Sequence, residues 1–232
     1  MERLKRAGVS TVYWNATYLL RFVLKVVGRW KVNGREHLPR EGGFILVSNH
    51  LSNADPPILG AAVARRRVRF MAKKELFKYP FGIVPRLYGA FPVKRFEADL
   101  GALMNAERLL KRGEVLGMFP EGTRTRTGVI GKPHPGTALI ALRSGVPVLC
   151  CSLSGTELLS KPLNLLKQPR ITVTIGEPIV FDKVKKPSAE QIAAATERIF
   201  STIIAGLPDE YHGTYTRRQE TIDGDGDDPP GE

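Results

Sequence analysis

Two short apolar segments, residues 44–47 and 115–119, each pass directly into a polar turn, and this repeated arrangement constrains the fold more than any other feature. The first segment is β-rich and follows a Gly-Gly pair, as is typical of a buried strand. Its turn ends in Asp-Pro-Pro at residues 55–57, and an apolar run over residues 58–64 follows. Because Asp followed by Pro favours a helix start, we predict a strand, a turn and a helix here.

The turn of this first unit carries His50 and Asp55. Five residues apart in a regular helix, the two side chains would point to different faces, but across an irregular turn the carboxylate can fold back under the imidazole. Asp55 would then hold one ring N–H, and the other nitrogen of His50 would accept a proton from an alcohol. The alternative is that Asp55 only caps the helix and that His50 is a polar loop residue.

The second turn, FPEGTRT at residues 119–125, has the composition of an anion-binding site. Arg124 can form paired hydrogen bonds with a phosphate, Gly122 lets the backbone approach a ligand, and the threonine hydroxyls add donors. Beyond it, His134 is a second candidate base, although proline on both sides favours a turn residue there.

The His-x-x-x-x-Asp of residues 50–55 and the Phe-Pro-Glu-Gly-Thr-Arg of residues 119–124 together resemble the first and third sequence blocks of the glycerolipid acyltransferase family, in particular its bacterial lysophosphatidic acid acyltransferases. The second block, residues 89–95, keeps its arginine but has a lysine where an acidic residue is common. The fourth, residues 145–151, keeps one proline and has Cys150 in place of another. The resemblance covers residues 30–205.

The resemblance implies the transfer of a fatty acyl group from an acyl thioester to the free hydroxyl of 1-acylglycerol-3-phosphate, which makes phosphatidic acid. It implies a catalytic pair, His50 and Asp55. The implied substrate-binding residues are Arg95, Glu121, Gly122, Thr123, Arg124 and Lys132. The altered second block leaves another lysolipid or acylated acceptor as an alternative.

Within that set, Arg95 and Arg124 would clamp the phosphate, with Lys132 as a weaker third contact, and Glu121 would position the glycerol hydroxyl or neighbouring basic groups. Direct transfer needs no metal and no bound cofactor, since the thioester, on coenzyme A or on an acyl carrier protein, is a substrate. The chain has no Gly-x-Ser-x-Gly motif, in agreement with a reaction without an acyl-enzyme.

The charge is strongly positive, with a formal net charge of +12, and without the five acids among residues 223–232 the rest would carry +17. Such a field attracts anionic lipid surfaces, nucleic acids or phosphorylated substrates. No zinc-finger spacing, RNA-binding aromatic block or basic zipper occurs, so we expect no nucleic-acid partner. A non-catalytic basic binder of membranes or nucleic acids is the alternative from a different class.

Residues 1–29 form the first predicted unit, an amphipathic helix. The uncharged stretch 7–20 has 14 residues, short of the roughly 20 needed to span a bilayer, and no signal-peptide cleavage site follows. The apolar stripe consists of Val12, Ala16, Leu19, Val23, Val26 and Trp30. We expect it to lie in the headgroup region of an anionic membrane, and the alternative is that it packs on the domain itself.

Residues 30–210 are predicted to be one layered α/β acyltransferase domain with a central, mostly parallel sheet flanked by helices, followed by a disordered, polar and acidic tail at 211–232. Residues 30–39 are predicted to be a short strand and a turn. Further predicted strands cover residues 44–47, 68–72, 115–119, 146–152 and 171–175; predicted helices cover 55–64, 97–111, 137–144 and 188–205. The adjacent Cys150 and Cys151 argue against a disulfide and for a reducing compartment. We therefore expect a peripheral or monotopic protein on the cytoplasmic face of the membrane.

Two basic segments each fit two different roles. Residues 65–67, three arginines, could be a solvated helix end or a membrane-facing cluster. Residues 73–80, which mix lysines with aromatics, could be an ordinary helix start or a lip where the acyl donor and the membrane meet.

Overall fold

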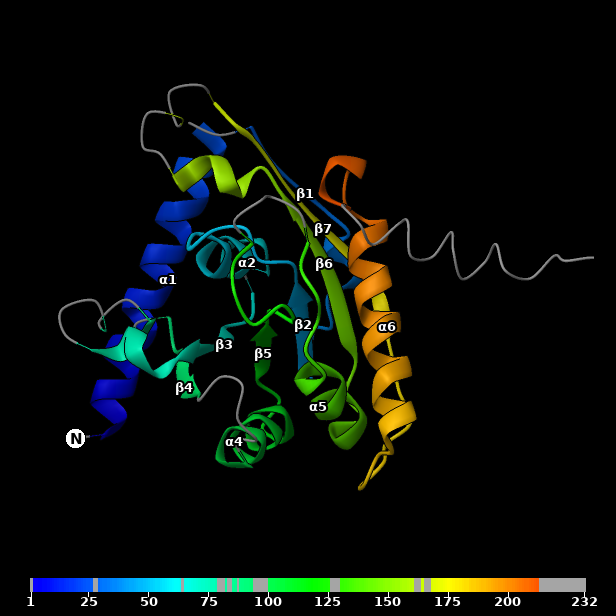
Figure 1. The fold of residues 1–232 in the computed structure, drawn as a ribbon. Coiled ribbons are helices and arrows are strands. Elements are labelled where there is room, and N and C mark those ends of the chain that lie inside the picture. The colour runs from blue at the N-terminus through cyan, green and yellow to red at the C-terminus, as the bar shows by residue number, and fades with distance from the viewer. Residues whose placement is uncertain are drawn as a thin grey trace, which may run out of the picture.

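The computed structural model describes residues 2–26, 29–63, 65–78, 82, 85–86, 88–93, 100–125, 130–160, 164 and 168–212, and these form one sheet with helices on both faces (Figure 1). The strands are β1 (Arg29–Asn33), β2 (Phe44–Ser48), β3 (Val68–Lys73), β4 (Phe91–Val93), β5 (Val115–Met118), β6 (Val148–Ser154) and β7 (Arg170–Ile179). The α-helices are α1 (Glu2–Val26), α2 (Asp55–Val63), α4 (Leu100–Lys111), α5 (Gly136–Ser144) and α6 (Ala189–Ala205). Short 3-10 helices are η1 (Arg35–His37), η2 (Lys74–Phe77), η3 (Thr156–Ser160) and η5 (Asp209–Tyr211).

The sheet has the strand order β1-β7-β6-β2-β5-β3-β4. Every neighbouring pair is parallel except β6 and β7, which are antiparallel. The predicted α/β class and mostly parallel sheet are confirmed. β2 lies between β5 and β6, so its carboxyl end is next to that of β5, and the two polar turns of the sequence meet at one edge of the sheet.

The core has two parts, one on each face of the sheet, because successive side chains of a strand point to opposite faces. On β2, Ile45 and Val47 pack in the part that includes residues of α4, α5 and α6. Phe44 and Leu46 pack in the other part, which includes residues of α1 and α2. All five residues of β2 are buried, as expected of a strand covered on both faces.

Two helix ends have capping residues with a local sequence signal. Ser188 accepts a hydrogen bond from the backbone of Gln191, whose side chain accepts one from the backbone of Ser188, and this capping box begins α6. Gly145 ends α5 with a φ of 66°, a left-handed conformation that glycine adopts without steric cost. Three strands differ from the prediction: the three-residue β4 was missed, β6 begins and ends two residues later, and β7 extends four residues beyond the predicted end at 175.

Helix α1 packs on the domain and also has an exposed apolar face. Tyr13, Thr17 and Leu24 are buried. Most of the predicted stripe lies on the outside, where Leu19 is 64% exposed and Val12, Val23 and Val26 are also exposed. The residues that hold α1 to the domain are thus different from the predicted stripe. Within the described ranges, no helix is long and apolar enough to cross a membrane.

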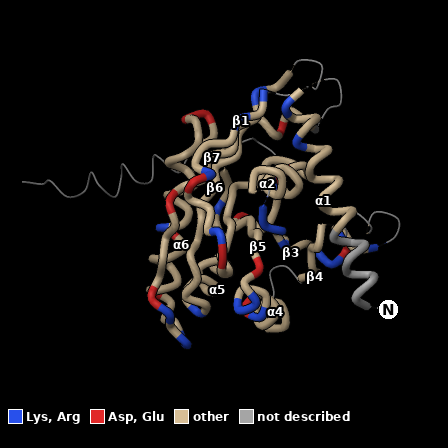
Figure 2. The backbone as a smooth tube through the Cα atoms, turned by 180° about the vertical axis from the view of Figure 1, so that it is seen from behind, with Lys and Arg blue, Asp and Glu red and all other residues tan. Residues whose placement is uncertain are grey.

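The arginines at 65–67 include two structural residues. Arg66 donates to the backbone oxygens of Pro39, Arg40, Gly42 and Gly113. Arg67 lies over the ring of Tyr13, with 4.8 Å from its guanidinium carbon to the ring centroid, and burial lowers its pKa. These contacts give the two residues a structural role that was not among the two predicted, because the side chains join loops and α1 to the sheet. Figure 2 shows how basic positions gather around β3 and where α1 meets β1.

The folded part continues into the segment that the sequence assigned to the tail. Tyr211 is buried, its hydroxyl accepts from the backbone of Gly155 at 3.0 Å and donates to Glu157 at 2.9 Å, and its carbonyl oxygen accepts from Ile130. The predicted boundary at 211 is therefore too early for this residue. Residues 213–232 lie outside the described ranges.

Candidate active site

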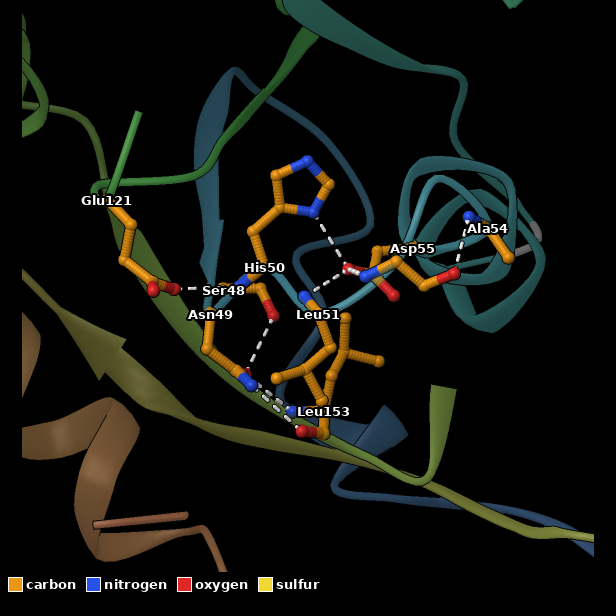
Figure 3. A network of polar contacts seen from close by, with 9 residues as sticks. Ser48, Asn49, His50, Leu51, Ala54, Asp55, Glu121 and Leu153 are labelled. Carbon is orange, nitrogen blue, oxygen red and sulfur yellow. Dashed lines mark hydrogen bonds and ion pairs between the residues drawn. The ribbon is translucent and has the colours of Figure 1, made fainter. Parts of the chain in front are cut away.

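His50 and Asp55 form a buried pair at the carboxyl end of β2 (Figure 3). The predicted contact is confirmed: Nδ1 of His50 lies 2.8 Å from Oδ2 of Asp55. Because an ionised carboxylate can only accept, Nδ1 carries the proton, and in the neutral ring Nε2 has the free lone pair. Nε2 points away from Asp55 (Figure 3), and His50 lines a large cavity.

The turn fixes Asp55 by backbone hydrogen bonds. Oδ2 also accepts from the backbone N–H groups of Leu51 and Ser52, each at 2.7 Å. Asp55 is fully buried at the first residue of α2, and its other oxygen, Oδ1, has no donor among the described residues. Three donors on one oxygen hold the carboxylate below the imidazole, so Asp55 both starts the helix and orients His50.

Aromatic stacking fixes the imidazole from the side. The ring of Phe119 lies parallel to that of His50, with centroids 4.1 Å apart, and Phe70 stacks on Phe119 at 5.7 Å. Both phenylalanines line the same cavity as His50. The ring therefore has few alternative orientations, as a positioned base requires.

Glu121 lies differently from the prediction. It is 4% exposed, and each carboxylate oxygen accepts one backbone N–H at 2.8 Å: Oε1 from His50 and Oε2 from Gly131. Burial raises the pKa of Glu121 to about 7; the nearby charge of Asp55 also raises it, and the two N–H contacts lower it. Its hydrogen bonds join the two loops, so the expected contact of Glu121 with substrate is replaced by a role in holding His50.

Asn49 is a site residue that the sequence analysis missed. Its side-chain nitrogen donates to the carbonyl oxygen of Leu153 at 2.9 Å, and its side-chain oxygen accepts from the N–H of Leu153 at 2.8 Å (Figure 3). The regular pairing of β2 with β6 ends one residue earlier, at Ser48 and Cys151. The amide continues this pairing with side-chain atoms while the backbone turns away to place His50. An asparagine directly after a buried strand was the available signal.

Of the remaining predicted substrate-binding residues, only some lie at the cavity that His50 lines. Thr125 donates its N–H to the carbonyl oxygen of His50 at 2.9 Å, so the second turn lies against the first. Gly122 lines the cavity with a φ of 65°, and a Cβ there would lie 3.0 Å from the His134 ring, which also faces the cavity. Thr123, Arg124 and Lys132 are exposed.

Neither cationic side chain, Arg124 nor Lys132, has a hydrogen bond or an ion pair within the part of the chain that the structure describes. Both charges are therefore available to an anion near the two turns. Arg95 and its neighbour Lys94 lie outside the described residues.

The cavity next to His50 has a volume of about 900 Å³ and is mostly apolar. Its walls come from β3, α4, α5 and the ends of β4 and β5, and include Phe70, Tyr88, Leu103, Phe119, Leu139 and Ile140. This size is in the range of small-molecule sites. The described residues contain no group of three or more His, Cys, Asp or Glu side chains that could hold a metal ion.

A second, more open cavity of about 450 Å³ adjoins the first and shares Ala90 with it. Lys74, Lys78 and Arg86 line it together with Phe77. In the described ranges, none of these three cations has a carboxylate partner. The segment at 73–80 thus contributes a basic hollow beside the reaction cavity, and its helical part is only the short η2.

The arrangement defines a class of protein, an α/β enzyme with an oriented histidine base next to an apolar cavity. Among the described residues, the imidazole of His50 is hydrogen-bonded to Asp55 and not to a serine or cysteine. A family model described as Acyltransferase matches residues 29–154, more than half of the chain. The chain belongs to the acyltransferase family.

Individual relatives narrow the comparison. The 1-acyl-sn-glycerol-3-phosphate acyltransferase of Bacillus subtilis (strain 168) is 34% identical over 182 residues, covering 78% of this chain and 89% of the relative. The protein of the same name from Streptococcus pneumoniae (strain ATCC BAA-255 / R6) is 32% identical over 192 residues, covering 79% of this chain and 69% of the relative. The crystal structure of the 1-acyl-sn-glycerophosphate (LPA) acyltransferase PlsC from Thermotoga maritima is similar with a TM-score of 0.61 and 25% identity, over 88% of this chain and 82% of that one.

Proposed function

We propose that this enzyme transfers a fatty acyl group from an acyl thioester to the free hydroxyl of 1-acylglycerol-3-phosphate and so makes phosphatidic acid for phospholipid biosynthesis. The observation that carries the proposal is the oriented His50–Asp55 pair facing an apolar cavity. The names of the relatives at 34% and 32% identity support the acceptor.

In the proposed reaction, Nε2 of His50 takes the proton of the acceptor hydroxyl as its oxygen attacks the thioester carbonyl carbon. Asp55 stabilises the imidazolium that forms. The carbon–sulfur bond then breaks, the thiolate takes the proton from His50, and the products are the new ester and a free thiol. No acyl-enzyme is formed, and neither a metal nor a bound cofactor takes part.

Backbone donors of the first turn are already in use. The N–H groups of His50, Leu51 and Ser52 bond to Glu121 and Asp55. They position the base and are not available to the carbonyl oxygen of the substrate. Stabilisation of the oxyanion is therefore a task for donors outside this turn.

The acceptor phosphate would lie near the second turn. Arg124 has the planar fork that suits phosphate, and Lys132 adds a point charge. Both are exposed and unpaired in the described part of the chain. Arg95 remains the other predicted phosphate clamp, and Gly122 and Thr123 would bring backbone and hydroxyl close to the ligand. The apolar cavity would hold an acyl chain with its carbonyl next to His50.

The donor side is the basic hollow lined by Lys74, Lys78 and Arg86. Coenzyme A and the prosthetic group of an acyl carrier protein both have phosphate between the thioester and the bulk of the carrier, so a basic surface next to the reaction cavity suits either. Substitution of these three residues should raise the KM for the donor more than that for the acceptor.

The experiment that tests the function is the acylation of lysophosphatidic acid by the purified protein. It should form phosphatidic acid and free thiol from acyl-coenzyme A or acyl-carrier protein, and a parallel series with other lysolipids tests the acceptor. Transfer to another lysolipid with none to lysophosphatidic acid would overturn the acceptor. An absence of transfer from both donors to every acceptor would overturn the enzymatic proposal.

The membrane part of the proposal rests on α1. Its exposed face includes Leu19 and Phe22, 64% and 65% exposed, with Tyr18, Val23 and Val26 beside them. We propose that this face lies in the headgroup region on the cytoplasmic side, which makes the protein peripheral or monotopic. The free, buried Cys150 and Cys151 suit the reducing compartment.

Tyr13 and Leu24 of α1 are buried against the domain, so deletion of the helix would expose the core that they cover. Point substitutions on the outer face are therefore the better test. Leu19→Gln and Phe22→Gln should lower vesicle binding and leave the melting temperature nearly unchanged. Tyr13→Gln is the matched control on the inner face and should lower the melting temperature. Unchanged vesicle binding by the two outer variants would contradict the placement of this face in the membrane.

A further inference from the structure

Two arginines from different elements lie on one tryptophan near the carboxyl end of α1. The guanidinium carbon of Arg21, on α1, is 5.9 Å from the centroid of the Trp30 ring, and that of Arg35, on η1, is 5.5 Å from it. Trp30 belongs to β1, so three elements meet here. Stacking on an aromatic ring limits the orientations that a guanidinium can take.

The two charges lack a counter-ion. In the described ranges neither Arg21 nor Arg35 forms an ion pair, although Glu36 is next in sequence. The one hydrogen bond here is long, 3.4 Å from Nη1 of Arg21 to the carbonyl oxygen of Ala61. The indole N–H of Trp30 is buried and also has no acceptor in the described part.

The positive charge of Arg21 is unfavourable for the charged form of Arg35. Burial lowers the pKa of Arg35, and the positive charge of Arg21 lowers it further. Two like charges that are close together and partly removed from water are unfavourable without an anion between them. Arg21 is half-buried and Arg35 is exposed, as are Lys25 and Lys31 on the same surface. What distinguishes the two arginines is their contact with the Trp30 ring.

The location points to the kind of anion. Arg21 directly precedes Phe22 in sequence, and Val23 and Val26 belong to the same exposed apolar face of α1. Figure 2 shows the basic positions where α1 and β1 meet. Neither arginine lines the cavity that contains His50, so this cluster is separate from the reaction site. A fixed pair of guanidinium groups next to an apolar face matches a lipid, which has a phosphate next to apolar chains.

We propose that Arg21 and Arg35 form a binding site for the phosphate of an anionic membrane phospholipid, held in place by Trp30. The inference rests on the proposed membrane association of α1 and adds a defined headgroup contact to it. Each guanidinium can donate two parallel hydrogen bonds to phosphate oxygens, whereas the surrounding lysines contribute only diffuse attraction. The site would fix the depth and rotation of α1 at the surface.

The test measures vesicle binding of the full chain without donor or acceptor, so it is independent of acyl transfer. Vesicles of phosphatidylcholine are compared with vesicles that also contain phosphatidic acid, at an ionic strength high enough to screen long-range attraction between charges that are not in contact. Arg21→Gln and Arg35→Gln should each weaken binding to the anionic vesicles about tenfold or more, the range for a charge-assisted pair. The matched controls Lys25→Gln and Lys31→Gln should change it by less than about twofold under this screening.

A second readout uses Trp30 itself. In a Trp14→Phe background, Trp30 is the remaining tryptophan of the chain. Its fluorescence should respond to dihexanoyl phosphatidic acid and not to dihexanoyl phosphatidylcholine, and Arg35→Gln should abolish the response. Because Arg35 is outside α1, this variant remains informative if Arg21→Gln loosens the helix. Arg35→Lys keeps the charge but loses the planar fork and should recover less than half of the response.

Three outcomes would overturn the proposal. Equal losses for the arginine and lysine variants would mean diffuse attraction only. A Trp30 response to inorganic phosphate as strong as that to the short-chain lipid would mean a site for free phosphate. A wild-type chain that binds no anionic vesicle and gives no Trp30 response would remove the site, whereas loss of acyl transfer with both signals intact would refute only the proposed reaction.

Discussion

Replacement of Glu121 by glutamine should change how the stability of the protein depends on pH. In the folded protein, burial raises the pKa of Glu121 from 4.5 to about 7. Between these two values the folded state holds a proton that the unfolded state has released, so the contribution of Glu121 to stability falls as the pH rises through this window. One pKa unit corresponds to about 1.4 kcal/mol, so the free energy of unfolding falls by about 3 kcal/mol over the whole window.

The assay is urea unfolding of wild type and Glu121→Gln at a series of pH values from 5 to 8, with the difference in free energy of unfolding plotted against pH. The difference cancels the titration of all other groups. Wild type should lose up to about 3 kcal/mol relative to the variant across the series. A flat difference would mean that Glu121 is ionised throughout, and a rise with pH would refute burial as the dominant cause.

The remaining predictions concern the other parts of the site. Asp55→Asn should lower kcat by about 10²–10⁴-fold with a small change in melting temperature, because an amide favours the wrong tautomer of His50; near-normal kcat would remove Asp55 as the orienting group. Arg124→Lys should raise the KM for the acceptor more than that for the donor, and equal rises would contradict a phosphate contact. Asn49→Ala should cost on the order of 2–4 kcal/mol of stability and also lower kcat, because both backbone groups of Leu153 lose their partner; Asn33→Ala, which removes one 3.4 Å bond, is the control and should change little.

The His50–Asp55 contact was predictable because both residues lie in one turn between a strand and a helix. An apolar strand followed by Asp-Pro-Pro limits where the backbone can go, and only the carboxylate of Asp55 is within reach of the imidazole. The capping box at Ser188 and the glycine end of α5 were predictable for the same reason, since their signals are local.

The roles of Glu121 and Asn49 were not predictable, because they depend on which strands are neighbours. Glu121 reaches His50 only because β5 pairs with β2, and Asn49 reaches Leu153 only because β6 lies on the other side of β2. Local sequence does not specify that order. A strand was predicted at the position of β7, but its antiparallel pairing with β6 was not, and the three-residue β4 was missed. A short apolar run indicates neither its partner nor its direction.

The outer face of α1 shows a different limit. Helical spacing correctly grouped Val12, Leu19 and Val23, but periodicity alone could not tell which apolar side of the helix packs on the domain. Tyr13 and Leu24 are the residues that pack on the domain, because α2 and the sheet lie against their side of the helix. Most of the predicted stripe is therefore exposed. Vesicle binding by the Leu19 and Phe22 variants tests whether this face contacts a membrane.

The central claim is that His50 activates the acceptor hydroxyl for direct transfer. The most direct measurement is the release of free thiol from an acyl thioester by wild type and His50→Ala, each with and without lysophosphatidic acid. Wild type should release thiol only when the acceptor is present, in equal amount to phosphatidic acid, and His50→Ala should be slower by about 10²–10⁴-fold with an unchanged melting temperature. A burst of thiol without acceptor, or near-normal turnover by His50→Ala, would contradict it.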